Sequence, residues 1–279
     1  MELFPISKFK HCMCIGVNNN EDKKSFLRQR HIYKYMNMEN ALNSLQDNYL
    51  YFQVPSEWED RFEKWLYEAD YSQLPNGSTF SPKIYACCFT LSKECEAAWN
   101  TYTYGNKTGL ASRGVQFVLH RKKLRKCFEK YASSQASTTF YEGKVNYKYS
   151  RFLIENMHKP STNETINTLH NLYFNNFSKS KYLFALLLKR PAFEYENEIR
   201  FLLEDMTDCK KDANRSKIVQ INWSDIIVRI IIDESCTDLE QTIFREQCNR
   251  ICKSKGWNLF EITKGDIHAK QLTPAKIHP

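Results

Sequence analysis

Short apolar segments rich in β-branched and aromatic residues alternate with segments whose apolar residues recur at helical spacing. The first kind predicts strands, namely residues 31–35, 49–54, 85–90, 114–119, 199–203, 218–221, 226–232 and 257–262. The second kind predicts helices, namely residues 39–45, 58–66, 94–104, 122–131, 165–189 and a last helix from Thr237. Hairpin-like strands mix with helix-separated ones, so we predict an α+β fold rather than a doubly wound parallel sheet.

Polar stretches without periodicity mark the ends of these elements. Residues 18–24 are polar and unpatterned, so we expect ordered structure to begin near His31. Residues 132–143 are rich in Ser and Thr and are predicted to form a loop. We therefore expect an N-terminal arm, residues 1–30, followed by a single domain, residues 31–279.

Two helix ends carry local signals. Pro191 is expected to stop the long helix, because proline disfavours the helical conformation of the residue before it. Thr237 and Glu240 have the spacing of a capping box at the start of the last helix.

Composition argues against export and membrane insertion. The longest apolar runs, residues 182–188 and 226–232, are far shorter than the roughly 20 residues that a transmembrane helix needs. Lys8, Lys10 and His11 leave no room for the apolar region of a signal peptide. The ten cysteines are therefore expected to be reduced thiols, and we predict a soluble, cytoplasmic protein with no membrane partner.

The formal net charge of +8 includes a basic run in the helix predicted at residues 122–131. Its cations are Lys122, Lys123, Arg125 and Lys126. Such a run can bind the phosphates of a nucleic acid through release of counterions. The alternative is a helix face that only contacts solvent.

Metal and nucleotide motifs are weak or absent in the sequence. Cys12 and Cys14 beside His11 offer zinc ligands without the paired C-x-x-C that would complete a site, and Cys248 and Cys252 fall on an apolar helical stripe. No metal site is predicted. The glycines form neither G-x-G-x-x-G nor a Walker pattern, and G-x-S-x-G is missing, which disfavours Rossmann, P-loop and α/β-hydrolase enzymes.

The segment Glu194–Phe201 carries the most suggestive chemistry. On a strand, alternate side chains share a face, so Glu194, Glu196, Glu198 and Arg200 would project together while Ile199 and Phe201 enter the core. A catalytic group of acids is one interpretation. An exposed strand face with Glu198 paired to Arg200 is the other.

Six motifs in order connect the chain to a known family. They are Tyr33-Lys34-Tyr35, Leu50-Tyr51-Phe52 with Trp58-Glu59-Asp60, Cys88-Phe89-Thr90, Trp99-x-x-Tyr102, Gly114-Val115-x-Phe117 and Tyr195-Glu196-Asn197-Glu198-x-Arg200. Together they resemble a widespread bacterial domain-of-unknown-function family, often encoded in mobile and phage-defence islands, over about residues 31–272. The opening strand, helix and strand of that family look like the entry to the ADP-ribosyltransferase fold.

This resemblance implies roles for particular residues. Tyr33, Lys34 and Tyr35 would hold NAD from the first strand, and Tyr51 with Asp60 would line the nicotinamide region. On the later acidic strand, Glu198 or Glu196 would be the catalytic glutamate, and Arg200 would support the cofactor site. The family usually has Asn-Asp-Pro where this chain has Glu59-Asp60-Arg61.

The implied chemistry is the stabilisation of charge by a carboxylate. Cleavage of the nicotinamide–ribose bond generates an oxocarbenium-like cation, which a preorganised carboxylate stabilises as in glycoside hydrolysis. Arg200 would keep the carboxylate ionised, and a second acid would take the proton of the attacking group.

The leading hypothesis is therefore an ADP-ribosyltransferase-like effector or toxin of a bacterial antiviral-defence or toxin–antitoxin system. It would use NAD to modify a macromolecule, with RNA preferred because of the basic surface, and an antitoxin or regulatory protein would be a partner. Two alternatives stay open. One is a nucleic-acid-binding or nuclease module, and the other is a non-enzymatic sensor whose aromatic surface binds a partner.

Overall fold

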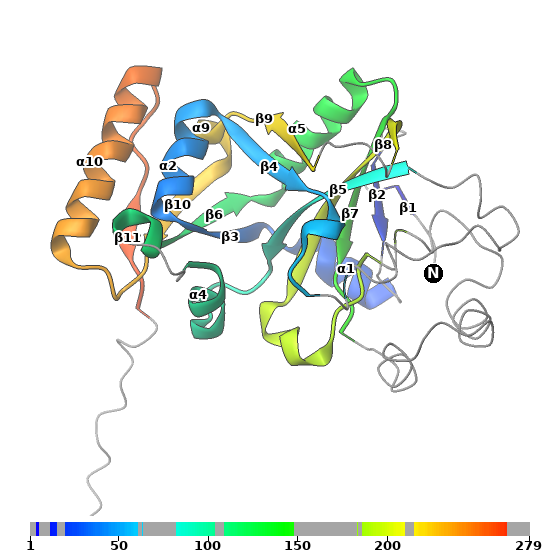
Figure 1. Ribbon diagram of the computed structural model, residues 1–279, viewed down its shortest axis with the longest axis horizontal. Helices are drawn as coiled ribbons and strands as arrows, with labels where there is room; N and C mark the ends of the chain where they lie inside the picture. Colours follow the sequence, from blue (N-terminus) through cyan, green and yellow to red (C-terminus); the bar gives the residue numbers. More distant parts are fainter. Residues whose placement is uncertain are drawn as a thin grey trace, which may run out of the picture. The chain divides into compact units, whose positions relative to one another are not determined.

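The computed structural model describes residues 4–5, 12–15, 20–60, 63, 82–103, 109–147, 183, 186–209 and 215–266. The chain divides into two compact units. Unit 1 comprises Met1–Arg30, Leu50–Leu91 and Lys122–Ile221, and unit 2 comprises His31–Tyr49, Ser92–Arg121 and Asn222–Pro279. Each unit combines a mixed, mostly antiparallel set of strands with flanking helices (Figure 1), which confirms the prediction of an α+β fold.

Unit 1 is built on five strands in the order β1-β2-β7-β8-β5, and β4 pairs with both β5 and β9. Its strands are β1 (Phe4–Pro5), β2 (Cys12–Ile15), β4 (Tyr49–Gln53), β5 (Pro82–Thr90), β7 (Thr138–Lys144), β8 (Glu198–Cys209) and β9 (Ser216–Gln220). Its helical elements are α1 (Asn20–Arg28), η1 (Pro55–Glu57), α5 (Arg121–Ser134) and η4 (Pro191–Glu196). Strand β8 lies between β5 and β7 and is antiparallel to both.

The core of unit 1 is an aromatic cluster on one face of β8. Phe201 lies at its centre, with ring centroids 5.0 Å from Phe89, 5.3 Å from Phe128 and 5.5 Å from Phe140. Phe128 comes from α5, so this helix covers the face. Ile199, Phe201 and Leu203 are all fully buried, as their predicted alternation along the strand requires.

Unit 2 contains four strands in the order β3-β6-β10-β11. They are β3 (His31–Asn37), β6 (Gly114–His120), β10 (Ile227–Ile232) and β11 (Ile262–Lys264). Its helices are α2 (Met38–Asp47), α4 (Glu96–Thr103), η3 (Gly109–Ser112), α9 (Trp223–Ile226) and α10 (Asp238–Lys255). The capping box predicted at the start of α10 is present, since Thr237 and Glu240 satisfy each other's backbone N–H groups.

Helices cover both faces of β6. On one face, Trp99 of α4 packs with Tyr35, Val118 and Ile231. Phe117 alternates with Val118 on β6 and therefore lies on the other face, where its ring meets Trp223 with centroids 5.4 Å apart. The indole Nε1 of Trp223 donates to the carbonyl of Ser44 in α2.

The first ordered elements precede His31, contrary to the sequence-based expectation. The segment expected to be an arm contains β1, β2 and α1, and β2 pairs in parallel with β7. Helix α1 has two large apolar residues, Phe26, which is buried, and Leu27, which is 44% exposed. A single buried aromatic residue anchors this helix, and one residue is too weak a signal for periodicity to detect.

Strand β7 replaces part of the loop expected over residues 132–143. Thr138, Phe140 and Tyr141 are buried, and β7 pairs with β2 on one side and β8 on the other. Threonine and aromatic residues are good strand formers when both faces are covered. The Ser and Thr content was misread as a loop signal, so that prediction was wrong.

The predicted acidic strand begins four residues later than expected. Glu194 and Glu196 belong to the 3₁₀ helix η4, and β8 begins only at Glu198. Pro191 at the start of η4 supplies the helical φ angle, and Asn197 ends the helix in the left-handed region at φ 41°. Proline therefore begins a helix here, whereas the sequence analysis expected it only to end one.

Two predicted helices lie mostly outside the described residues. These are residues 58–66, of which 58–60 and 63 are described, and residues 165–189, of which 183 and 186–189 are described. The end of the second prediction was wrong, because Leu188 forms a parallel bridge with Asn146. The strand predicted at residues 257–262 is also displaced, since β11 begins at Ile262.

Among the helices of the described segments, none combines the length and apolar character needed to cross a bilayer.

Candidate functional site

The backbone around Asn197 directs the side chains of Glu196 and Glu198 toward the same ammonium group, that of Lys189. Glu196 is the last residue of η4 and Glu198 is the first of β8, with Asn197 between them in the left-handed conformation. Asparagine tolerates this conformation better than most residues. Thr90 of β5 fixes the turn, because its Oγ1 donates to the carbonyl oxygen of Glu196 and Leu91 N–H donates to the carbonyl of Asn197.

The strand register then sets which side chains share a face. Arg200 is opposite Cys88 of β5, and Glu198 is opposite Thr90. These four side chains, two from β5 and two from β8, project from one face of the sheet, and Phe201 projects from the other face. One strand thus presents a charged face on one side and an aromatic core on the other.

Five charged side chains meet on this face, and we call them the β8 ion cluster. They are Glu63, Lys189, Glu196, Glu198 and Arg200. All belong to unit 1, and each is between 1 and 6% exposed. The formal charge of the five is −1, from three carboxylates and two cations. Buried charges of this kind persist only when paired and hydrogen-bonded.

Arg200 is the centre of the cluster. Its Nε and Nη2 atoms each lie 2.9 Å from an oxygen of Glu198, which forms a bidentate pair. Nη2 also donates to Glu63, and Nη1 donates to the carbonyl of Leu186 at 2.6 Å. The guanidinium carbon lies 4.2 Å from the ring centroid of Trp58, so the planar group is stacked as well as hydrogen-bonded.

Lys189 binds three carboxylates at once. Its Nζ atom lies 2.5 Å from Glu196, 3.1 Å from Glu63 and 3.3 Å from Glu198. The ammonium also lies 4.9 Å from the ring centroid of Phe193. Glu196 and Glu198 therefore share one ammonium, although they come from different elements.

The neighbouring cations control the protonation of Glu198. Burial alone would raise the pKa of its carboxyl, but the positive charges of Arg200 and then Lys189 outweigh burial and lower the pKa to about 2. In return, Glu198 and Glu63 raise the pKa of Lys189 despite the opposing effect of burial. Glu198 is consequently an ionised carboxylate throughout the physiological pH range.

Neutral polar groups complete the surroundings of Glu198. Its backbone N–H donates to the phenol oxygen of Tyr147 at 2.7 Å. Cys88 forms a side-chain hydrogen bond with the carboxylate, and burial, followed by the negative charge of Glu198, raises the pKa of the thiol. Burial and then Glu198 likewise raise the pKa of Tyr147. Both groups stay protonated at neutral pH and can act as hydrogen-bond donors.

Asp60 and Tyr51, predicted to line a cofactor site, lie in unit 1 as well. Asp60 accepts hydrogen bonds from Nε and Nη2 of Arg190 at 3.1 and 3.0 Å. Arg190 is the residue that follows Lys189 in the sequence. Its partner Arg190 also stacks on Phe193, 5.0 Å from the ring centroid. Tyr51 is different, because it lies on β4 with 49% of its surface exposed.

Tyr33, Lys34 and Tyr35 lie on β3 in unit 2, whereas the β8 ion cluster belongs to unit 1. The Tyr35 hydroxyl accepts the backbone N–H of Cys95 at 3.1 Å, and its ring meets Trp99 edge to face with centroids 4.8 Å apart. Burial raises the pKa of Tyr35 and, less strongly, that of Tyr33. Tyr35 is thus part of the core of unit 2, while Tyr33 and Lys34 are partly exposed.

The four basic residues predicted to contact nucleic acid lie on α5 and divide into two groups. Lys122, Lys123 and Lys126 are exposed. Arg125 is turned inward, where it lies 3.4 Å from Glu142 and 3.7 Å from Glu129. A fourth exposed lysine on the same helix, Lys130, was not in the prediction.

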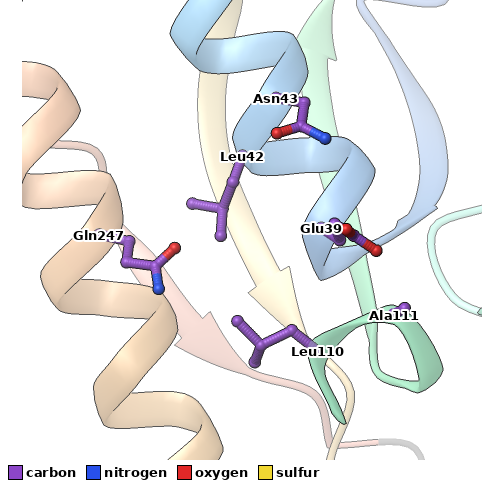
Figure 2. A pocket seen from close by; sticks show the side chains of 6 residues that line it. All are labelled: Glu39, Leu42, Asn43, Leu110, Ala111 and Gln247. Carbon is purple, nitrogen blue, oxygen red and sulfur yellow. The ribbon is translucent and has the colours of Figure 1, made fainter. Parts of the chain in front are cut away.

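A hollow of about 290 Å³ lies in unit 2 between α2, η3 and α10. Figure 2 shows Leu42 and Leu110 pointing into it, with Gln247 on the opposite side and Glu39 and Asn43 at the rim. None of its lining residues was predicted as a site residue. Its lining combines two leucines and one alanine with two uncharged amides and one carboxylate, and it contains no cluster of reactive groups.

No group of three or more His, Cys, Asp or Glu side chains within the described ranges is arranged to hold a metal ion. The three carboxylates that converge in the β8 ion cluster surround the ammonium of Lys189.

Sequence reasoning identified Glu196, Glu198 and Arg200 but missed Lys189 and Glu63 as their partners. The only local signal for Lys189 was its position two residues before Pro191, at the end of an apolar run. Glu63 lies 137 positions from Arg200, and no sequence spacing shows such a contact. The partners of a buried charge are set by the tertiary fold.

Comparison with known proteins gives a family match over part of the chain. Residues 98–201 are similar to a family described only as a protein of unknown function (DUF2971). This range includes Trp99, the Gly114-Val115 pair and the segment from Tyr195 to Arg200, so it covers three of the six motifs. No curated protein and no solved structure matches the chain. The chain is therefore similar, over about its middle third, to a family whose function is unknown.

Proposed function

We propose that this chain is an ADP-ribosyltransferase-like effector or toxin that transfers ADP-ribose from NAD to a macromolecule. One observation carries the proposal: Glu198 is a buried carboxylate whose pKa is lowered to about 2 by Arg200 and Lys189, at the first residue of a central antiparallel strand. Strongly shifted titratable groups concentrate at functional sites. The resemblance of the ordered motifs supplies the reaction class and the setting in antiviral defence or toxin–antitoxin systems.

In the proposed reaction, the bond between nicotinamide and ribose C1′ breaks, and its electron pair leaves with nicotinamide. The ionised Glu198 stabilises the positive charge that develops on the ribose. A hydroxyl oxygen of the target forms the new bond to C1′ and releases its proton to Glu196. Glu196 is placed for this role because it shares the ammonium of Lys189 with Glu198 and therefore lies beside it.

Access to the carboxylate requires one existing contact to give way. Both oxygens of Glu198 accept hydrogen bonds from Arg200 at 2.9 Å, whereas the Lys189 contact is longer, at 3.3 Å. We propose that the ribose of NAD displaces Lys189 from Glu198 while the bidentate pair with Arg200 persists. Arg200 would then act as a positioning residue that keeps the carboxylate oriented and ionised.

The other residues implied by the resemblance are part of the same proposal. Tyr51 offers an exposed ring for stacking, and Asp60 is held by Arg190 near the cluster. Tyr33, Lys34 and Tyr35 of unit 2 are proposed to contact NAD on the resemblance alone.

The proposal is tested by transfer of label from NAD. The full chain is incubated with NAD labelled in the adenylate portion and with total cellular RNA or lysate. We expect labelled macromolecules with the wild type and a loss of about 10²–10³-fold in rate with Glu198→Gln, because the amide has no charge to stabilise the ribose cation.

A matched variant separates chemistry from folding. Glu63 also contacts both cations of the cluster, Arg200 and Lys189, but has no role in the proposed chemistry. Glu63→Gln removes its charge. It should destabilise the protein about as much as Glu198→Gln while retaining transfer within a few-fold. A wild type that transfers no label and releases no nicotinamide would contradict the proposal. So would equal losses in the two variants when both remain folded.

The second candidate is a non-enzymatic interaction protein. Tyr51 and Tyr195 are exposed by 49 and 36%, and exposed tyrosines are frequent at protein interfaces. Expression of the wild type and of Glu198→Gln in bacterial cells distinguishes the two candidates. Toxicity that disappears with the amide argues for chemistry at Glu198, and equal toxicity argues for a binding role.

A further inference from the structure

The exposed face of α5 has an unusual composition. Its exposed side chains are four lysines and two serines, namely Lys122, Lys123, Lys126, Lys130, Ser133 and Ser134. The helix contains a single acid, Glu129, which is buried. An ordinary solvated helix gains stability from acid–base pairs at i,i+4, and this face has none.

The fold explains why the lysines stay outside. Leu124 and Phe128 are fully buried and anchor α5 on the aromatic core of unit 1. Arg125 turns inward and pairs with Glu129 and Glu142, so these two acids are neutralised by Arg125 and not by one of the four exposed lysines. The one carboxylate of α5 is therefore buried beside Arg125 and does not lie on the lysine face.

The positions of the cations also oppose the helix macrodipole. The first turn of α5 begins Arg121-Lys122-Lys123 and has no acid, although the positive end of a helix favours acidic residues there. Lys122, Lys126 and Lys130 then continue at i, i+4 and i+8, which places them about 6 Å apart along the axis. Phosphates follow one another at about 3.4 Å along one strand of a nucleic acid, so neighbouring lysines of this row are spaced like every second phosphate.

We infer that the lysine face of α5 binds the phosphodiester backbone of a nucleic acid. A regular row of like charges that is not neutralised by its own helix complements a regular polyanion. The contacts are to phosphates and not to bases, so binding is expected to depend little on sequence. This inference deepens the proposed function by naming the class of target, but it rests on α5 alone and does not require the NAD reaction.

The test is binding without NAD, measured by fluorescence anisotropy with the full chain. The probes are a labelled single-stranded RNA, a single-stranded DNA of equal length, and vesicles containing an anionic phospholipid. With four lysines in contact, raising the salt concentration from 50 to 200 mM should weaken binding to these single strands roughly 50-fold. A preference for RNA over DNA would identify the target within this class.

The decisive variant replaces Lys122, Lys126 and Lys130 by glutamine together. We expect the affinity to fall at least tenfold at low salt, and the slope of log K against log salt to become shallower by about 2. The matched control replaces three exposed lysines outside α5, namely Lys24, Lys253 and Lys264, by glutamine, so its net charge changes by the same amount. The control should bind within about twofold of the wild type.

Three results would overturn the inference. They are equal losses in the two triple variants, a salt slope unchanged in the α5 variant, and binding to vesicles but to neither nucleic acid. Because NAD is absent, none of these results bears on the reaction proposed at Glu198. Conversely, a Glu198→Gln protein that no longer transfers label leaves this binding test intact.

Discussion

The two faces of strand β8 are equally buried but are held together by different physics. On one face, Phe201 and its neighbours are stabilised by removal of apolar surface from water and by dispersion contacts. On the other face, Arg200, Glu198 and their partners are stable only because every charge has an opposite charge within hydrogen-bonding distance. The apolar face tolerates gradual change, whereas the charged face depends on all of its members.

That difference also separates structure from chemistry. An aromatic core contributes stability and a rigid base for the strand. A buried ion cluster of net charge −1 contributes little net stability, because removing its charges from water costs free energy and apolar residues of similar size often stabilise a fold as well or better. A fixed, ionised carboxylate is instead what stabilisation of a developing cation requires. The charged face is therefore the part of unit 1 in which we seek function.

The largest effect is expected from Arg200→Met. The change leaves three buried carboxylates, Glu63, Glu196 and Glu198, with only Lys189 to neutralise them. The free energy of unfolding should therefore fall by about 3–5 kcal/mol. Urea denaturation measures it. A double variant with Glu198→Gln removes one of the stranded charges and should recover part of the loss. A loss below about 1 kcal/mol would mean that the cluster is much less buried or less coupled than described.

Acid should weaken the charged face next. The carboxyl of Glu198 has a pKa of about 2 in the folded chain against an ordinary value of 4.5. A lowered pKa contributes stability that is fully present above the unfolded value and is lost as pH falls through the folded value. We expect the wild type to lose about 3 kcal/mol more than Glu198→Gln between pH 5 and pH 2. A difference between the two proteins that does not vary with pH would count against this assignment.

The smallest effect is expected on the aromatic face. Phe201→Leu keeps an apolar side chain and leaves a modest cavity among Phe89, Phe128 and Phe140, so the loss should be about 1–2 kcal/mol. The size of this loss should be the same at pH 7 and pH 3, because no titratable group is involved. Denaturation at both pH values checks it, and a pH-dependent loss would show that the two faces are coupled.

Local sequence patterns were sufficient for most elements. Strands β3, β4, β5, β6 and β10 and helices α2, α5 and α10 were expected near their observed positions, because each has a periodic apolar pattern or a capping signal. Strand β7 was missed because its threonines resemble a loop, and only pairing with strands on both sides makes it a strand. The 3₁₀ helix before β8 was missed because alternation of acids at 194, 196 and 198 imitates a strand.

The candidate site was predicted only in part for a related reason. Glu196, Glu198 and Arg200 are adjacent in sequence, so their grouping could be inferred from one short segment. Glu63, Lys189 and the ring of Trp58 come from other segments and meet Arg200 only in the folded chain. The expectation of an exposed Glu198–Arg200 pair was correct about pairing and wrong about exposure, since both side chains are buried.

The central claim is that Glu198 is an ionised carboxylate that meets NAD, and carbon-13 NMR of labelled glutamate tests it most directly. The Glu198 resonance is identified by its loss in Glu198→Gln. We predict that it titrates with a pKa near 2 and shifts when NAD is added at neutral pH. Titration near the ordinary value of 4.5, or no response to saturating NAD, would contradict the account.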